Sequence, residues 1–284
     1  MDPKRGLKRI DRKRICLYTP PFAGDTSMLS TIKAAEEYGL GGVELMNFCR
    51  ELKTPDFETA AFLAGEARKR DLKIPCFTVS IDILADPDGA ASKLKEYAKI
   101  CALLGIELLH HTIAKDFRCH TIGDDEITER FYRCVPAVRE VAEFAEALGV
   151  KTVTENQGFV FNGAERLLAL RERTGGKIGF VADVGNILFV DGDPAGMIRR
   201  LGGNILHAHL KDYVYTSSCQ DDGFTYFSRK NRSFRDAEIG TGDIGFRDVF
   251  EAFDEEGYRG FFSLEFTNVA DGNEARRVLE RISY

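Results

Sequence analysis

The sequence predicts one α/β domain, a single (β/α)8 barrel of the TIM type, and three observations carry this prediction. Eight short apolar runs alternate with longer segments whose apolar residues recur every three or four positions, the pattern of strand–helix units around a parallel sheet. The length of 284 residues is close to the ~250 residues typical of this barrel. Neither a shift in composition nor a Pro-rich linker divides the chain. We therefore expect one barrel over residues 14–284, preceded by a basic N-terminal leader over residues 1–13.

The strands and helices of this barrel can be placed in order along the chain. The eight expected strands span residues 14–19, 41–47, 73–80, 106–113, 150–156, 177–183, 204–211 and 260–266. A glycine that can adopt a left-handed conformation ends the helical pattern before five of them, namely Gly39, Gly105, Gly149, Gly175 and Gly257. Residues from about 212 to 245 show no periodicity, so we expect a long functional loop after the seventh strand.

Composition and charge exclude several classes of protein. The net charge of -6 argues against a nucleic-acid partner, because tracking a phosphate backbone requires a basic surface. The seven cysteines include no C-x-x-C pair and several lie inside apolar runs, which favours buried thiols in a reducing, cytoplasmic compartment. An apolar targeting segment and an uninterrupted run of about eighteen apolar residues are both missing, so no membrane partner is expected.

Four expected strands, the fifth to the eighth, each end on or near a residue that can bind a metal. Glu155 ends "KTVTE", Asp183 ends "IGFVAD", His209 lies near the end of "NILHAHL" and Glu265 ends "GFFSLE". The C-terminal ends of barrel strands build the active site, so these side chains should face one another. A single carboxylate at a strand end is more often a helix cap or solvated, but four such residues in register are hard to attribute to capping. We therefore predict that they share a divalent metal ion.

The donor set indicates the metal and the chemistry. Three carboxylates and one imidazole favour Mn2+, with Mg2+, Co2+ or Zn2+ as alternatives, over a structural zinc held by Cys and His. A sugar could chelate such an ion through a carbonyl and the adjacent hydroxyl, and the ion would stabilise the enediolate formed on loss of a carbon-bound proton. Glu155 and Glu265 could exchange that proton from opposite sides. This predicts an isomerase or epimerase of a small sugar or polyol ketone.

The same residues lie in segments that carry a family resemblance. The chain resembles the xylose-isomerase-like superfamily of sugar isomerases, epimerases and inosose dehydratases, in order and spacing over nearly its whole length. The segments that carry it are "YGLGGVEL", "TENQG", "FVADVGN", "HAHLKD" and "IGTGDIGFRDVFEAFDEEGYRGFFSLEF". The resemblance implies a TIM barrel in which Glu155, Asp183, His209 and Glu265 bind the metal and the two glutamates act as acid and base.

Two positions depart from the ketose 3-epimerases of that superfamily. Asn186 stands where many of them have the His of Asp-x-x-His, and it suits a hydrogen bond to a substrate hydroxyl. Lys211 and Asp212 follow His209 where they have Arg, as in the inosose dehydratases. A lyase that uses the same enediolate to eliminate a hydroxyl is therefore a second candidate.

Other members of the superfamily supply further alternatives. A subunit that depends on a partner polypeptide, as in the C-glycoside-cleaving relatives, is one, and a homo-oligomer is compatible with the sequence. DNA repair of the endonuclease IV type is disfavoured, because five His in total, with Asn186 in place of one, leave too few ligands for a three-zinc cluster.

Further polar residues near strand ends are candidates for contacting substrate. Glu44, near the end of the second strand, could bind a sugar hydroxyl, with an internal salt bridge as the alternative. One of His110 and His111 should face the barrel mouth, because neighbours on a strand point oppositely, and we select His111 over a structural rim histidine. His207 shares a strand face with His209 and should lie one layer deeper.

Three residues beside the expected ligands could assist them. Lys211 is long enough to place its ammonium over the site, against the alternative of an ion pair with Asp212 or Asp243. Asn156 and Gln157 directly follow Glu155, so they could orient its carboxylate or reach the substrate.

Overall fold

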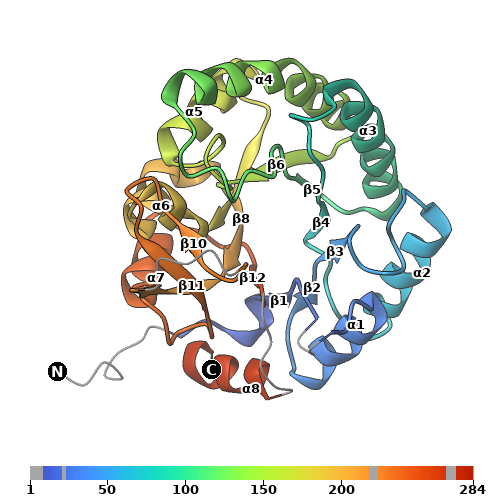
Figure 1. Cartoon of the computed structure of the whole chain (residues 1–284). Coiled ribbons are helices and arrows are strands. Elements are labelled where there is room, and N and C mark those ends of the chain that lie inside the picture. The colour runs from blue at the N-terminus through green and yellow to red at the C-terminus, as the bar shows by residue number, and fades with distance from the viewer. Residues whose placement is uncertain (1–8, 21–23, 218–222, 267–272, 284) are drawn as a thin grey trace.

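The computed structural model describes residues 9–20, 24–217, 223–266 and 273–283. In these residues a ring of parallel strands is surrounded by eight α-helices (Figure 1). The strand order is β2-β1-β12-β8-β7-β6-β5-β4-β3. β2 (Gly42–Val43) pairs with β1 and β3 (Leu45–Met46) pairs with β4, so the two short segments are halves of one strand that closes the ring. The predicted single (β/α)8 barrel is confirmed.

The other barrel strands all fall inside the predicted apolar runs. They are β1 (Ile15–Leu17), β4 (Cys76–Val79), β5 (Leu108–His111), β6 (Lys151–Glu155), β7 (Gly179–Asp183), β8 (Ile205–Leu210) and β12 (Phe262–Leu264). The helices around them are α1 (Met28–Glu37), α2 (Phe57–Arg68), α3 (Pro87–Leu104), α4 (Asp124–Ala147), α5 (Ala164–Arg173), α6 (Pro194–Leu201), α7 (Phe246–Glu255) and α8 (Glu274–Ile282). Among the described residues, no helix combines the length and the apolar character that a membrane crossing requires.

Helix α3 shows how the local sequence sets one strand–helix unit. The Asp86 side chain accepts a hydrogen bond from the Gly89 N–H and caps the helix, and Pro87 occupies a first-turn position where its missing N–H costs nothing. Gly105 ends the helix in the left-handed region at φ 67°. The N–H of Ile106 then bonds to the Cys101 carbonyl, and the chain turns towards β5.

The first and the last residues of the described chain lie next to each other. The N–H of Ile10, a buried residue, bonds to the Ile282 carbonyl at 2.7 Å. The Arg12 Nε donates to Ser283 Oγ at 3.0 Å. Two residues of the expected leader, Ile10 and Arg12, therefore contact the C-terminal segment, and residues 1–8 lie outside the described residues.

The segment after β8 differs from the irregular loop that the sequence predicts. It contains a three-stranded antiparallel sheet in the order β10-β11-β9, made of β9 (Asp212–Thr216), β10 (Tyr226–Phe227) and β11 (Ser233–Ala237). Aromatic rings hold it against the barrel; Phe234, for example, lies 5.0 Å from Phe189 between ring centroids. These strands are short and both of their faces are partly covered, so no clear alternation of apolar and polar residues marks them in the sequence.

Asp212 fastens this added sheet to the segment that leads into α7. Its Oδ2 accepts hydrogen bonds from the N–H groups of Gly240 and Gly242, at 2.9 and 2.8 Å. Its Oδ1 accepts from Tyr213 at 2.9 Å and from Ile244 at 3.2 Å. One carboxylate therefore satisfies four backbone donors from two separate segments.

Substitution of Asp212 by Ala should lower the free energy of unfolding by about 3 kcal/mol, because it leaves several shielded N–H groups without an acceptor. Urea denaturation would measure the loss. Glu251→Ala, which removes an exposed pair with Arg247, is the control and should change stability by less than ~1 kcal/mol. Equal losses in the two variants would contradict the fastening role of Asp212.

Candidate metal centre

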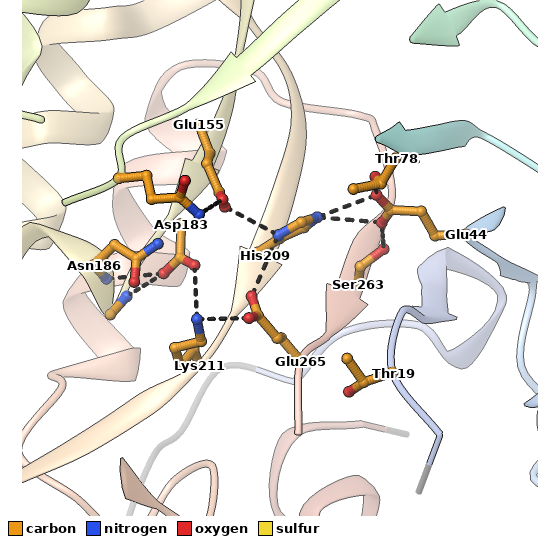
Figure 2. A network of polar contacts seen from close by, with 12 residues as sticks. Thr19, Glu44, Thr78, Glu155, Asp183, Asn186, His209, Lys211, Ser263 and Glu265 are labelled. Carbon is orange, nitrogen blue, oxygen red and sulfur yellow. Dashed lines mark hydrogen bonds and ion pairs between the residues drawn. The ribbon is translucent and has the colours of Figure 1, made fainter. Parts of the chain in front are cut away.

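Four side chains from neighbouring strands converge at one end of the barrel (Figure 2). Glu155 ends β6, Asp183 ends β7, His209 lies in β8 and Glu265 directly follows β12. One potential ligand atom from each lies within 4.8 Å of the others. The Nδ1 of His209 is 3.5 Å from the Oε2 of both Glu155 and Glu265. The structure therefore brings together all four residues that the sequence selects as metal ligands.

Three atoms of this cluster are buried without a hydrogen-bond partner among the described residues. They are Asp183 Oδ2, His209 Nδ1 and Glu265 Oε2. Buried polar atoms are rarely left unpaired, so this group needs an explanation. The second oxygen of Asp183 is satisfied, since it accepts the N–H groups of Gly185 and Asn186 at 2.9 Å each. Two carboxylate oxygens and one imidazole nitrogen are a donor set that suits Mn2+, Mg2+, Co2+ or Zn2+.

The charge of the cluster also fits a divalent cation. Lys211 is the nearby positive group, with its Nζ 2.6 Å from Glu265 Oε1 and 3.6 Å from Asp183 Oδ2. Burial raises the pKa of Asp183 to about 7 although Lys211 opposes the shift. Burial acts on Glu265 in the same direction, but the Lys211 ammonium and the His209 contact hold its pKa at about 2. Burial opposes a charge on His209, but Glu44, Glu155 and Glu265 around it raise its pKa well above its usual range. The carboxylates therefore attract positive charge to this site, and a divalent ion would supply it.

Two side chains that follow Glu155 orient the cluster. The Gln157 amide donates to Glu155 Oε1, which leaves Oε2 facing His209. Asn156 holds the backbone of Asp183 from both sides: its Nδ2 donates to the Asp183 carbonyl and its Oδ1 accepts the Asp183 N–H, at 2.9 Å each. The sequence leaves two roles open for Asn156 and Gln157, to orient the Glu155 carboxylate or to reach the substrate. The structure shows that Gln157 orients Glu155.

Lys211 and Asn186 both lie beside Asp183 (Figure 2). Lys211 pairs with Asp183 and Glu265, not with the expected alternatives Asp212 and Asp243. Asn186 is buried, and both polar atoms of its side chain lack a partner among the described residues. These two residues therefore offer a charged donor and an amide at the edge of the carboxylate cluster.

Glu44 lies on the opposite side of the His209 ring from the three carboxylates (Figure 2). It is fully buried, and its Oε2 lies 2.7 Å from Ser263 Oγ, 3.0 Å from His207 Nε2 and 3.2 Å from His209 Nε2. Its Oε1 accepts the Thr78 hydroxyl. Burial would raise the pKa of Glu44, but the two histidines hold it well below its usual range. The structure therefore places Glu44 in an internal ionic network. This network was the alternative to the expected contact with a sugar hydroxyl.

The orientation of the two histidines of β5 is the reverse of the expected one. His110 faces the interior: its Nδ1 is 3.0 Å from Thr78 Oγ1 and its ring centroid is 5.3 Å from that of His209. His111 has its Nδ1 3.2 Å from the Thr112 carbonyl oxygen, and burial lowers its pKa to about 4. Strand alternation requires that one of the pair faces inward, but pairing with β4, which sets His110 opposite Thr78, decides which one.

Sequence reasoning missed three residues that contact His209 or Glu44. The Tyr18 ring stacks on His209 with centroids 4.5 Å apart. Ser263 and Thr78 donate to Glu44. Ser263 could have been found, because it lies two residues before Glu265 and therefore on the same strand face. Tyr18 and Thr78 carry no comparable signal.

Comparison with known families agrees with this architecture. Residues 32–283 match the model of the family described as xylose isomerase-like TIM barrel. The chain belongs to this family. Two curated relatives match it in part. The rhizopine catabolism protein MocC of Rhizobium meliloti is 27% identical over 132 residues, 44% of this chain and 38% of that protein. An uncharacterised protein of Methanocaldococcus jannaschii is 28% identical over 151 residues, 50% of this chain and 45% of that protein. The chain thus spans less than half the length of each.

Solved structures of the family superpose over almost the whole barrel. D-psicose 3-epimerase of Clostridium cellulolyticum H10, solved with D-tagatose, has a TM-score of 0.69 at 17% identity, over 93% of this chain and 89% of that chain. The IolI protein with a bound zinc atom has a TM-score of 0.71 at 16% identity, over 95% and 100%. The probable 3-DHS dehydratase AsbF of Bacillus anthracis has 0.71 at 16%, over 94% and 97%. At these identities the likenesses establish the family fold.

Proposed function

We propose that this chain is a divalent-metal-dependent isomerase or epimerase of a sugar or sugar-like polyol ketone, which moves a carbon-bound proton through an enediolate. The observation that carries the proposal is the set of buried, unpartnered atoms of Asp183, His209 and Glu265 that meet Glu155 within 4.8 Å. Membership of the family and the epimerases among its structural neighbours support it. The oxygen-rich donor set favours Mn2+, and the zinc in the IolI structure keeps Zn2+ as an alternative.

Each residue of the cluster has a role in this proposal. A bound divalent ion supplies a Lewis acid that polarises the substrate carbonyl and stabilises the negative charge that develops on its oxygen. Gln157 occupies one oxygen of Glu155 and Lys211 occupies one oxygen of Glu265, so each glutamate presents its other oxygen to the cluster. One glutamate removes the carbon-bound proton, and the other returns a proton from the opposite side. Asn186 is placed to bind a substrate hydroxyl.

A second group of potential ligands is less suited to a metal. Glu44, His110 and His209 also offer atoms within 4.8 Å of one another. The carboxylate of Glu44, however, already faces Thr78, Ser263 and His207 as donors, so few of its lone pairs remain free. This arrangement describes a hydrogen-bond network that supports His209.

A screen for proton exchange tests the proposed reaction before the substrate is known. Purified protein loaded with Mn2+ is incubated in deuterated water with common ketoses and with inosose; the metal is then removed and the substrates are examined by NMR. We expect deuterium at one carbon of at least one substrate, together with an epimer or an aldose, and no exchange with metal-free protein. If the protein binds Mn2+ yet exchanges no carbon-bound proton in any ketone, the proposed proton transfer is wrong.

The contact between Lys211 and Glu265 favours one second candidate, a lyase. The ammonium, 2.6 Å from the carboxylate, can donate a hydrogen bond to a leaving hydroxyl, and the glutamate that has taken the carbon-bound proton can pass it to that hydroxyl, so that the enediolate expels it as water. A dehydratase among the structural neighbours supports this alternative. In the same screen, loss of water from inosose would identify the lyase, whereas an epimer or aldose would identify the isomerase.

A further inference from the structure

Glu44 occupies the gap between β2 and β3, where the second barrel strand is interrupted. Its N–H still pairs with the Leu17 carbonyl of β1 at 2.9 Å, so the backbone follows the barrel although the strand is broken. Its side chain turns into the barrel interior and is completely shielded from solvent. A carboxylate in such a place is costly unless several donors surround it, and Thr78, Ser263 and His207 meet this need.

The two ring nitrogens of His209 face different partners. Nε2 lies 3.2 and 3.4 Å from the two oxygens of Glu44. Nδ1 lies 3.5 Å from the Oε2 atoms of Glu155 and Glu265, on the side of the candidate metal site. An ionised carboxylate only accepts hydrogen bonds, so the contact with Glu44 favours a proton on Nε2. Glu155 and Glu265 likewise favour a proton on Nδ1 while no cation is bound, and a cation at the candidate site would replace that proton. Glu44 then keeps the remaining proton on Nε2, and the lone pair of Nδ1 is available to the cation.

Other contacts keep this ring and this carboxylate in place. The Tyr18 ring lies against His209 at 4.5 Å with an angle of 29° between the planes, which limits rotation of the imidazole. Glu44 and the residues around it, Thr78, His207 and Ser263, form a buried polar layer. Ser263 Oγ is 2.7 Å from Glu44 Oε2 and 2.8 Å from His207 Nε2, so one hydroxyl contacts two residues of this layer. The layer therefore contains the partners that a metal-binding histidine requires on its far side.

We propose that Glu44 is a positioning residue that fixes the Nε2–H tautomer of His209 and so presents Nδ1 to a divalent cation. The inference rests on the proposed metal site, and it assigns to Glu44 a function in metal affinity that acts through His209. Glu44 itself contacts neither the cation nor the substrate. Its removal leaves all four proposed ligands present but lets the imidazole adopt the other tautomer.

The tautomer can be measured directly in the unmodified protein. The chain has five His, so the ring nitrogens of 15N-His-labelled protein can be resolved by NMR, with the His209 signals assigned by their loss in His209→Gln. We expect Nε2 to carry a proton with and without metal, and we expect Zn2+, which is diamagnetic, to displace the proton from Nδ1 and to shift the Nδ1 signal. Loss of the proton from Nε2, or its retention on Nδ1, in the Zn2+-bound wild type would overturn the inference, even if no variant of Glu44 folds.

Substitution measures the contribution to affinity. Glu44→Gln turns an amide N–H towards groups that are themselves donors, and we expect it to weaken Zn2+ and Mn2+ binding about 10- to 100-fold in calorimetric titrations. Ser263→Ala is the matched control from the same layer; it removes another hydrogen bond to Glu44 but keeps the Glu44 contact with His209, so its metal affinity should stay close to that of the wild type.

The outcomes separate this inference from the proposed function. Wild-type protein that binds neither ion would refute the metal site itself. Wild-type protein that binds, with Glu44→Gln binding equally well, would refute the positioning role and leave the metal site standing. If Ser263→Ala loses as much affinity as Glu44→Gln, the layer acts through packing and the inference is wrong.

Discussion

Replacement of Glu265 by Gln is expected to slow exchange of the substrate's carbon-bound proton at least ~10³-fold, and Glu155→Gln should do the same. Each amide can still offer a neutral oxygen to a cation but cannot accept the substrate proton. Both carboxylates place an oxygen 3.5 Å from His209 Nδ1, at the candidate metal site, and the proposed reaction uses one of them to remove the proton and the other to return it, so loss of either stops the transfer. Epimerisation therefore needs both residues.

Exchange in deuterated water must be measured together with metal binding, because both glutamates belong to the cluster. Calorimetric titration gives the Mn2+ concentration at which each variant is saturated, and NMR then follows deuterium incorporation at that concentration. Glu165→Gln, an exposed glutamate that pairs with Arg200 on the surface, should exchange as fast as the wild type. Persistent exchange in both site variants, with Mn2+ bound, would show that other groups carry the proton.

The barrel could be predicted because its strands and helices have local signals. The run at 73–80 contains β4, and the glycine at 105 ends α3 where the sequence places the turn. The split of the second strand at Glu44 has no such signal. The segment 41–47 reads as an unbroken apolar run with one charge, and the partners of that charge, His207 and Ser263, come from strands more than 160 residues away in the chain.

The candidate site also has one part that the sequence predicts and one part that it does not predict. Its four metal-binding side chains stand at strand ends, and the barrel itself brings neighbouring strand ends together, so their convergence follows from the sequence. The layer below depends on pairing and register. Nothing in the sequence marks Thr78 as part of the site. Its pairing opposite His110 places both residues beside Glu44. The same pairing selects His110 over His111 as the inward histidine, which strand alternation alone does not decide.

Removal of the bound divalent ion is expected to abolish activity and to lower the melting temperature of the protein. A ligand that binds only the folded state stabilises it by about 2.7 kcal/mol when present at 100 times its dissociation constant. In a domain of this size that free energy corresponds to roughly 4–5 °C. Differential scanning calorimetry before and after treatment with a chelator measures the change, and added Mn2+ should restore both activity and melting temperature.

Asp183→Asn provides the decisive comparison for this experiment. The Asn Oδ1 can still accept the N–H groups of Gly185 and Asn186, so the local fold is retained. The substitution removes one ionisable carboxyl group from the buried cluster, and it replaces the unpartnered Oδ2 with a donor that cannot bind a cation. The metal-free variant should therefore melt at or above the temperature of metal-free wild type, because less like charge is buried, and Mn2+ should no longer raise it. An equal increase in both proteins would place the bound cation elsewhere in the molecule.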